Sequence, residues 1–242
     1  MARHSHWHNI QLKKGKADAR RANTFAKLAK NITVAAREGG GDPAFNFKLR
    51  VAVDAAKTIS VPKDNIDRAI ARGLGEGGEV ALEEVVYEGF GPGGVAFLVA
   101  CVTDNRNRTV ADVKMVASKN GGTIGVAGSV MWMFEKKGVL TFLDPATIPD
   151  RDAIELALIE AGADDFLPVG TDGVQATCDI KDLKRLAEAA EQGNWKPDGT
   201  GIEYVAKTTV AVEDPTVRAE LEKLVEALEQ NDDVDAVYTN DL

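Results

Sequence analysis

Three histidines near the start of the chain have the residue type and spacing of metal ligands. His4, His6 and His8 form an HxHxH pattern. Zinc usually takes three or four protein ligands that further hydrogen bonds hold in place, and with Met1 removed the free amine and His4 imidazole would suit copper or nickel in vitro. Residues 2–15 are polar and basic, so we expect a mobile arm that fixes no ligands. We therefore predict solvated histidines and no metal or other cofactor.

No set of residues suited to catalysis emerges. All three histidines lie in the expected mobile arm, so a Ser-His-Asp or Cys-His arrangement lacks a base. Cys101 and Cys178 lie far apart with no CxxC spacing, and we predict buried free thiols. Acid pairs such as Asp232-Asp233 are expected at polar turns, where the charge is solvated. The sequence predicts that this chain is not an enzyme.

Lysine and arginine are concentrated at the start of the chain. Residues 1–38 hold nine of them against only Asp18 and Glu38, a net charge of +7 in a chain of −9, so the rest carries −16. Such separation suits a basic face that meets a polyanion, although a charged face can also be simply solvated. The candidate contacts to nucleic-acid phosphate are Lys13, Lys14, Lys16, Arg20, Arg21, Lys27, Lys30, Arg37, Arg106 and Arg108.

The last two candidates lie in the segment TDNRNRT, residues 103–109, between a predicted strand and a predicted helix. Its Asp, Asn and Thr side chains are natural caps for that helix. Arg106 and Arg108 either contact phosphate or pair with nearby acids, and the sequence leaves both open. GFGPGG at residues 89–94 has glycines like a phosphate-binding loop, but no Lys-Ser/Thr follows, which favours a tight hairpin.

Apolar spacing predicts the elements that position the basic residues. Phe25, Leu28, Ile32 and Ala36 share one side of a helix that starts near residue 17 and stops at the glycines 39–41. A second helix is expected to begin with Asp42 as its cap and Pro43 in its first turn. Its apolar stripe is Leu49, Ala52, Val53 and Ala56. A third short helix covers residues 62–72, and the glycine-rich linker 73–80 follows.

After the linker, strands alternate with helices. Predicted strands include residues 129–136, 138–143 and a long one at 202–212. We expect an α+β fold with an N-terminal helical domain followed by two ferredoxin-like α/β domains, one inserted into the other. The first α/β block lacks a second crossover helix, which the C-terminal segment supplies. The predicted domains are 1–76 (basic, helical), 77–128 plus 206–242 (discontinuous α/β), and 129–205 (inserted α/β).

The composition allows a prediction of where in the cell the protein is located. Hydrophobic residues make up 44% of the chain, enough for a real core. No apolar run approaches the roughly 20 residues that span a bilayer, and the start lacks the apolar region of a signal peptide. We expect a cytoplasmic protein with DNA or RNA as partner, the ribosome being one alternative, and no membrane contact. The sequence predicts no oligomeric state.

Several long segments resemble the YebC/PmpR family, in order and over essentially the whole chain. They are HSHWHNIQLKKGKADARR, ITVAAREGGGDPAFNFKLR, VPKDNIDRAI, YEGFGPGGVA, TDNRNRT and GSVMWMFEKKG. The resemblance implies a helical domain followed by two α/β domains, and a transcriptional regulator that binds DNA. It also implies an alternative, because mitochondrial relatives are translational activators and bacterial ones are tied to relief of ribosome stalling. Where family members often carry AGHSKW and KRGKIF, this chain has His6 and Asn23, and the lost charge lowers the expected affinity for polyanions.

The sequence therefore predicts a non-enzymatic, nucleic-acid-binding regulator of gene expression, with DNA as ligand and the basic helical domain as contact surface. No helix-turn-helix pattern places side chains for base readout, so weak sequence preference is expected. One alternative is a ribosome-associated RNA-binding translation factor that uses the same surface. The other is a protein-interaction module whose acidic α/β body docks a basic partner.

Overall fold

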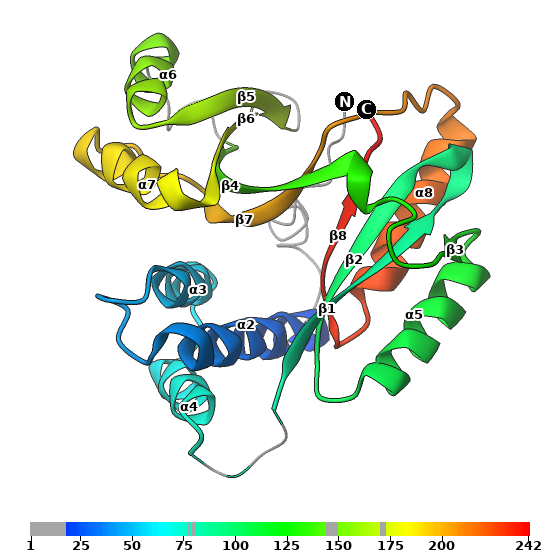
Figure 1. Ribbon diagram of the computed structural model, residues 1–242, viewed down its shortest axis with the longest axis horizontal. Helices are drawn as coiled ribbons and strands as arrows, with labels where there is room; N and C mark the ends of the chain where they lie inside the picture. Colours follow the sequence, from blue (N-terminus) through cyan, green and yellow to red (C-terminus); the bar gives the residue numbers. More distant parts are fainter. Residues whose placement is uncertain (1–17, 77, 79–80, 144–149, 170–172) are drawn as a thin grey trace. The chain divides into compact units, whose positions relative to one another are not determined.

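The computed structural model describes residues 18–76, 78, 81–143, 150–169 and 173–242 (Figure 1). Their contacts divide into two compact units. The first unit contains the described residues up to Met131 together with Val212–Val237, and the second contains Trp132–Ala211 with Tyr238–Leu242. The chain therefore leaves the first unit and returns to it. The linker residues 77, 79 and 80 lie outside the described part.

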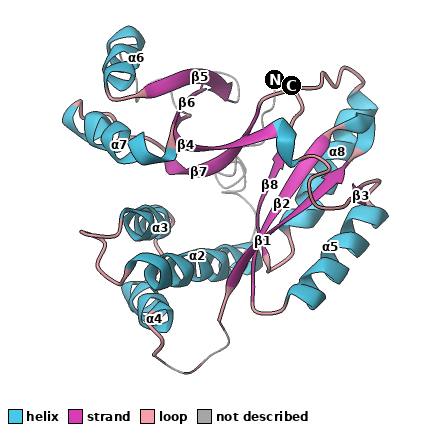
Figure 2. Cartoon of the chain, in the orientation of Figure 1, coloured by secondary structure: helices cyan, strands magenta, loops and turns pink. Residues whose placement is uncertain are grey.

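Three helices form the described N-terminal part of the first unit, from residue 18 onward (Figure 2). They are α2 (Asp18–Gly39), α3 (Phe47–Thr58) and α4 (Lys63–Gly73). Gly73 allows α2 and α4 to approach closely, because a Cβ there would collide with the Thr33 carbonyl. The predicted stripes supply the shared core, whose buried members include Leu28, Ile32, Ala36, Leu49, Val53, Ala56 and Ile66.

The predicted start of the second helix was wrong. Asp42 and Pro43 form a turn, and α3 begins four residues later with Asn46 as its cap. The Asn46 side chain accepts a hydrogen bond from Leu49 N at 3.0 Å and donates to the Ala35 carbonyl at 2.7 Å. This buried side chain forms hydrogen bonds with backbone groups of both α2 and α3. For this reason α3 begins after Asn46 and not at the Asp-Pro pair.

The first unit also holds a four-stranded sheet of order β3-β1-β2-β8. Its strands are β1 (Glu83–Phe90), β2 (Ala96–Thr103), β3 (Thr123–Ile124) and β8 (Val234–Thr239). The antiparallel pair β1–β2 runs from Glu83↔Thr103 to Phe90↔Ala96, and a 3-10 turn at Pro92–Gly94 joins its strands. The hairpin expected at GFGPGG is therefore present.

Two helices cover this sheet, α5 (Arg106–Lys119) and α8 (Pro215–Glu229). The helix α5 connects β2 to β3, which lie on either side of β1, so these elements form a split βαβ unit. The buried residues of one core cluster come from the β2–α5 segment and from the C-terminal segment: Val95, Phe97, Val99, Val113, Ala117, Leu221, Leu224, Leu228 and Val237.

The second unit contains a four-stranded sheet of order β5-β6-β4-β7. Its strands are β4 (Phe134–Phe142), β5 (Ala163–Val169), β6 (Gly173–Cys178) and β7 (Gly199–Ala206), and its helices are α6 (Arg151–Glu160) and α7 (Leu183–Gln192). Each helix joins two strands that flank a third, which is the ferredoxin-like arrangement. The α+β class, with an N-terminal helical region and two antiparallel sheets, is confirmed.

Two strand predictions in this unit were wrong. Residues 129–143 do not form two strands, since a 3-10 turn at Met131–Met133 leads into the single strand β4. Gly138 lies within β4, where it pairs with Cys178 and Ile202. A Cβ there would come within 2.8 Å of Leu183 Cβ, so the glycine allows close packing of α7 on the strand. The strand expected at 202–212 ends at Ala206, where its pairing with β4 ends. No described helix is long and apolar enough to cross a bilayer.

Candidate nucleic-acid interface

The first part of the predicted basic surface is only partly described. Lys13, Lys14 and Lys16 lie outside the described residues, as do the histidines of the HxHxH pattern. Arg20 and Arg21 lie in the first turns of α2, where the backbone is helical. Arg20 and Arg21 therefore belong to the beginning of the longest described helix.

Two lysines further along α2 contact residues 229–233, at and just after the end of α8, which belong to the first unit as α2 does. Lys27 Nζ donates to the Glu229 carbonyl in the last turn of α8. Lys30 Nζ donates to the Asp232 carbonyl at 2.9 Å and forms an ion pair with Asp233 Oδ1 at 2.7 Å. Cations at a helix C-terminus are favourable because the last carbonyls are unsatisfied and carry partial negative charge.

Asparagines extend this contact on both sides. Asn23 Nδ2 donates to the Gln230 carbonyl at 3.1 Å, and Asn31 Nδ2 donates to Asp235 Oδ1 at 2.7 Å. We call the four residues Asn23, Lys27, Lys30 and Asn31 the docking face of α2. This face holds α2 against the end of α8 and the start of β8. Part of the predicted basic stripe therefore binds groups of the protein itself.

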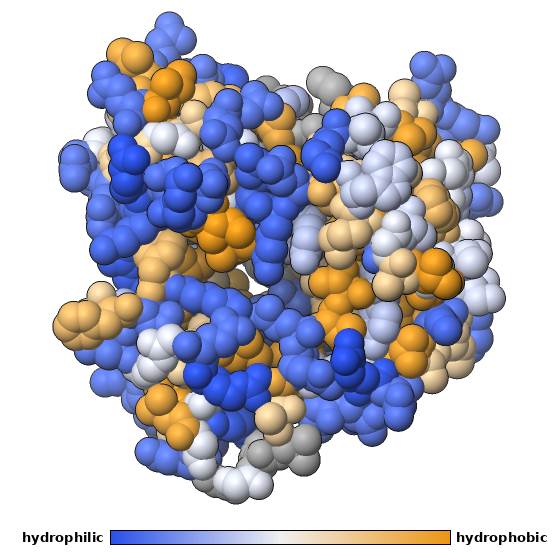
Figure 3. All heavy atoms as spheres, in the orientation of Figure 1, coloured by the Kyte–Doolittle hydropathy of each residue, from blue (hydrophilic) through white to orange (hydrophobic). Residues whose placement is uncertain are grey.

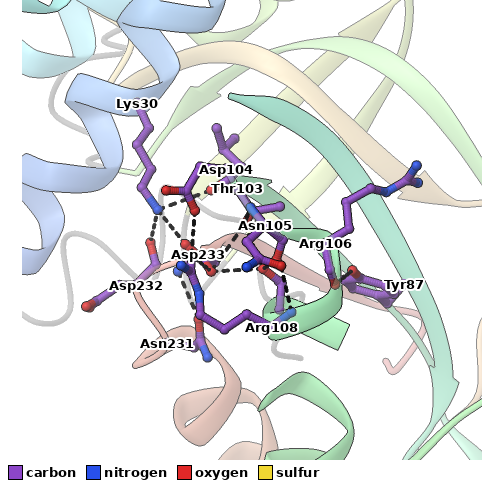
Figure 4. Close-up of polar contacts among 12 residues, drawn as sticks. Lys30, Tyr87, Thr103, Asp104, Asn105, Arg106, Arg108, Asn231, Asp232 and Asp233 are labelled. Atoms are coloured by element: carbon purple, nitrogen blue, oxygen red, sulfur yellow. Dashed lines mark hydrogen bonds and ion pairs between the residues drawn. The ribbon is translucent and has the colours of Figure 1, made fainter. Parts of the chain in front are cut away.

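Asp233 is the centre of the docking contact (Figure 4). Its side chain is buried, with 8% of its surface exposed. Besides Lys30, it accepts from Arg108 Nη2 at 2.7 Å, Thr109 Oγ1 at 2.9 Å and Thr103 Oγ1 at 3.3 Å. The expectation of solvated charge at Asp232-Asp233 was therefore wrong for Asp233, because its two cations come from segments far away in the sequence.

The surroundings of Asp233 favour its charged form. Burial by itself would raise the pKa of this carboxyl, but hydrogen bonds from Lys30, Arg108 and Thr109 outweigh burial and bring the pKa to about 2. Asp233 is thus a carboxylate throughout the physiological range. It neutralises Lys30 and Arg108 locally, which lowers their ability to attract a polyanion.

The arginines of TDNRNRT also have acidic partners. Arg108 pairs with Asp104 at 2.8 Å as well as with Asp233, and Arg106 Nε lies 3.7 Å from Glu83 Oε2. Asn105 is the cap of α5, accepting from Arg108 N at 3.1 Å. Of the two alternatives for these arginines, pairing with acids is the one present in the structure.

Arg37 and the outer faces of the helices complete the predicted surface. Arg37, near the end of α2, donates to the Leu82 carbonyl. Sequence analysis did not single out the exposed cations of α3 and α4, which are Lys57, Lys63, Arg68 and Arg72. Because these residues lie outside the apolar stripes, the sequence already indicated that they are exposed. Residues 1–76 hold fifteen Lys and Arg against seven Asp and Glu, a net charge of +8, so residues 77–242 carry −17.

The potential metal ligands and the two cysteines are separate features of the described residues. Among them, no group of three or more His, Cys, Asp or Glu side chains could hold a metal ion. Cys101 and Cys178 are buried and not in a disulfide, as predicted. Burial raises the pKa of each thiol to about 12, which keeps both protonated and poorly nucleophilic at neutral pH.

This architecture defines a class of α+β proteins that have an N-terminal helical region and two antiparallel sheets with helices. In this class the C-terminal segment completes one sheet and docks against α2. Comparison with known families makes this specific. The N-terminal domain of the TACO1/YebC protein matches residues 5–76, and the second and third domains of TACO1/YebC match residues 82–241. This chain belongs to the TACO1/YebC family, so the resemblance seen in the sequence is confirmed.

Individual relatives cover nearly the whole chain. A "Probable transcriptional regulatory protein" of Persephonella marina is 45% identical over 240 residues, covering 99% of this chain and 95% of its own length. A protein of the same description from Chloroflexus aurantiacus is 46% identical over 242 residues, with the same coverage. The crystal structure of a conserved hypothetical protein from Aquifex aeolicus has a TM-score of 0.87 at 39% identity, covering 98% of this chain and 97% of that one.

Proposed function

We propose that this chain is a non-enzymatic transcriptional regulator that binds nucleic acid, with DNA as its ligand, through its N-terminal helical region. The separation of charge at the linker is the observation that carries the proposal, with +8 before residue 77 and −17 after it. An acidic body is repelled by phosphate while a basic region is attracted, so a polyanion would meet the molecule in one orientation. The names of its relatives support the transcriptional role.

The contacts narrow the proposed surface. We assign Lys27, Lys30 and Arg108 to holding the first unit together, because their side chains bind carbonyls and carboxylates within it. Phosphate contact then falls to the residues at the start of α2 and before it. These are Lys13, Lys14, Lys16, Arg20 and Arg21. Arg37, in the last turn of α2, and Arg106, beside Glu83, remain candidates away from the start of α2.

Charge reversal tests the proposal directly. The double variant Arg20→Glu and Arg21→Glu should lose most affinity for a labelled DNA duplex in fluorescence anisotropy, because each lysine or arginine contact to phosphate releases counterions. Lys181→Glu with Lys184→Glu is the matched control, with the same change of charge on exposed residues of the second unit. Equal affinity of the two variants would contradict the proposed surface.

The salt dependence gives a second readout. With about six phosphate contacts, affinity for random duplex should fall roughly a thousandfold between about 50 and 200 mM salt. The Arg20 and Arg21 variant should show a shallower slope of log K against log salt, since it makes fewer such contacts. Unchanged slope in this variant would mean that other residues bind the phosphates.

A ribosome-associated RNA-binding translation factor is the second candidate function. One observation favours it. Phe45 in the helical region is 90% exposed, and an aromatic ring on a nucleic-acid-binding surface suits unpaired bases, which are more typical of RNA than of duplex DNA. Cosedimentation with ribosomes that survives physiological salt, without preferred binding to any promoter fragment, would select this function over the first.

A further inference from the structure

The connection between α2 and α3, residues 40–46, presents an exposed aromatic ring. We call this segment the Phe45 loop; Figure 1 shows it leaving the end of α2 and turning back into α3. Phe45 is 90% exposed, the highest value among the exposed large hydrophobic side chains of the described residues. Hydrophilic side chains prevail over α2 and α3 in the view of Figure 3.

The Phe45 loop is held in place by its own hydrogen bonds. Asp42 Oδ1 accepts from Ala44 N at 2.9 Å, and the Asp42 carbonyl accepts from Phe45 N at 3.1 Å and Asn46 N at 2.9 Å. The buried Asn46 side chain donates to the Gly40 carbonyl at 2.8 Å as well as to Ala35. The backbone that carries Phe45 is therefore fixed on both sides, and little order must be gained when the ring meets a ligand.

The loop also rests on α4. A Cβ at Gly41 would lie 2.8 Å from Leu74 Cδ1, so the glycine lets the loop approach Leu74 closely. Leu74 is half exposed and lies directly after α4. At the start of α3, the Arg50 guanidinium lies 5.0 Å from the centre of the Phe47 ring, which places a cation close to the loop.

From this geometry we propose that Phe45 stacks on an unpaired base of RNA held by the basic helical region. The proposal rests on the proposed function only in that this region contacts nucleic acid. A stacking ring needs one flat partner, and every base offers a π-face. A protein partner would instead need a wider apolar surface of several hundred Å², whereas the Phe45 loop also carries the exposed charge of Asp42.

RNA is the source of the base because of how the two nucleic acids present their bases. Bases of duplex DNA are stacked on each other and are read at their edges in the grooves. Recognition of RNA mostly targets single-stranded loops and bulges, whose splayed bases stack on aromatic side chains. Phosphate contacts from the start of α2 would supply attraction for either nucleic acid, and Phe45 would add preference for unpaired RNA.

The proposal is tested by measuring how substitutions of Phe45 change the binding of two RNA probes. One probe is a labelled RNA hairpin with a single-stranded loop of about 8 nucleotides, and the other is a fully paired RNA duplex of the same total charge. Phe45→Ala should weaken binding to the looped RNA at least fivefold, the lower end of the loss expected when one stacked base loses its ring, and leave duplex binding unchanged. Because the ring is exposed, the circular-dichroism melting curve should not change.

Two further variants separate stacking from apolar contact. Phe45→Trp should keep or strengthen binding to the looped RNA, whereas Phe45→Leu should weaken it like Phe45→Ala, because leucine is apolar but has no π-face. Unchanged affinity of Phe45→Ala, equal loss for both probes, or full binding by Phe45→Leu would overturn the proposal. Wild-type protein that binds DNA duplex but not the looped RNA would overturn this proposal alone. Wild-type protein that binds neither RNA probe nor DNA duplex would overturn the proposed function as well.

Discussion

Replacing Asp233 with asparagine should loosen the docking of α2 without affecting the second unit. The change keeps the shape of the side chain but removes the charge that Lys30 and Arg108 share. A pKa of about 2 against the ordinary 3.8 corresponds to about 2.5 kcal/mol at pH 7. Breaking a fully buried ion pair costs about 3–5 kcal/mol, and since both cations here are partly exposed, about 2–3 kcal/mol is expected.

The pH dependence of this loss follows from the direction of the shift. Because the pKa of Asp233 is depressed in the folded protein, its contribution is fully present above pH 3.8 and is lost as pH falls towards 2. The difference between wild type and Asp233→Asn should therefore be constant from neutral pH to about pH 5 and fall to about 1.3 kcal/mol at pH 3.

Urea unfolding followed by far-UV circular dichroism at several pH values gives the magnitude, and hydrogen exchange gives the location. Protection should fall in α2 and at Val102, whose amide donates to the Asp233 carbonyl at 2.8 Å. Asp232→Asn is the matched control, the same substitution at an exposed neighbour that uses only its carbonyl to bind Lys30. Equal stability of the two variants, or a difference that grows on acidification, would refute the reasoning.

Two other predictions concern single elements. Asn46→Ala should destabilise the helical region by about 1–3 kcal/mol, because it removes a helix cap and leaves the Ala35 carbonyl without its donor; thermal unfolding measures this, and a loss below about 0.5 kcal/mol would argue against the cap. A chain that ends at Asp214 should lose exchange protection in β2, because it lacks the buried Leu221, Leu224 and Leu228 of α8, each worth roughly 1.5–3 kcal/mol. Unchanged protection of residues 95–102 in that chain would show that the C-terminal segment is a separate unit.

Local patterns in the sequence were sufficient for most elements. The 3.6-residue spacing of Leu28, Ile32 and Ala36 predicts the buried face of α2, and that of Leu49, Val53 and Ala56 predicts the buried face of α3. These patterns are reliable because burial of an apolar stripe dominates the stability of a helix in a globular protein.

Features set by distant residues were not predictable in the same way. Asp233 looks like a solvated turn residue until Lys30 and Arg108, which are 203 and 125 positions away, are brought to it. The role of Lys27 and Lys30 in docking was hidden for the same reason, since a basic stripe gives no sign of which neighbour it faces. Asn46 was missed because Asp42-Pro43 is a stronger local start signal than an asparagine whose second partner lies on α2.

Crosslinking in cells, followed by sequencing of the recovered DNA or RNA, tests the central claim that the N-terminal helical region contacts nucleic acid. The account predicts that the wild-type chain and the Lys181→Glu, Lys184→Glu control recover nucleic acid in similar amounts, and that the Arg20→Glu, Arg21→Glu variant recovers little. Equal recovery with all three proteins, or none with the wild type, would contradict it.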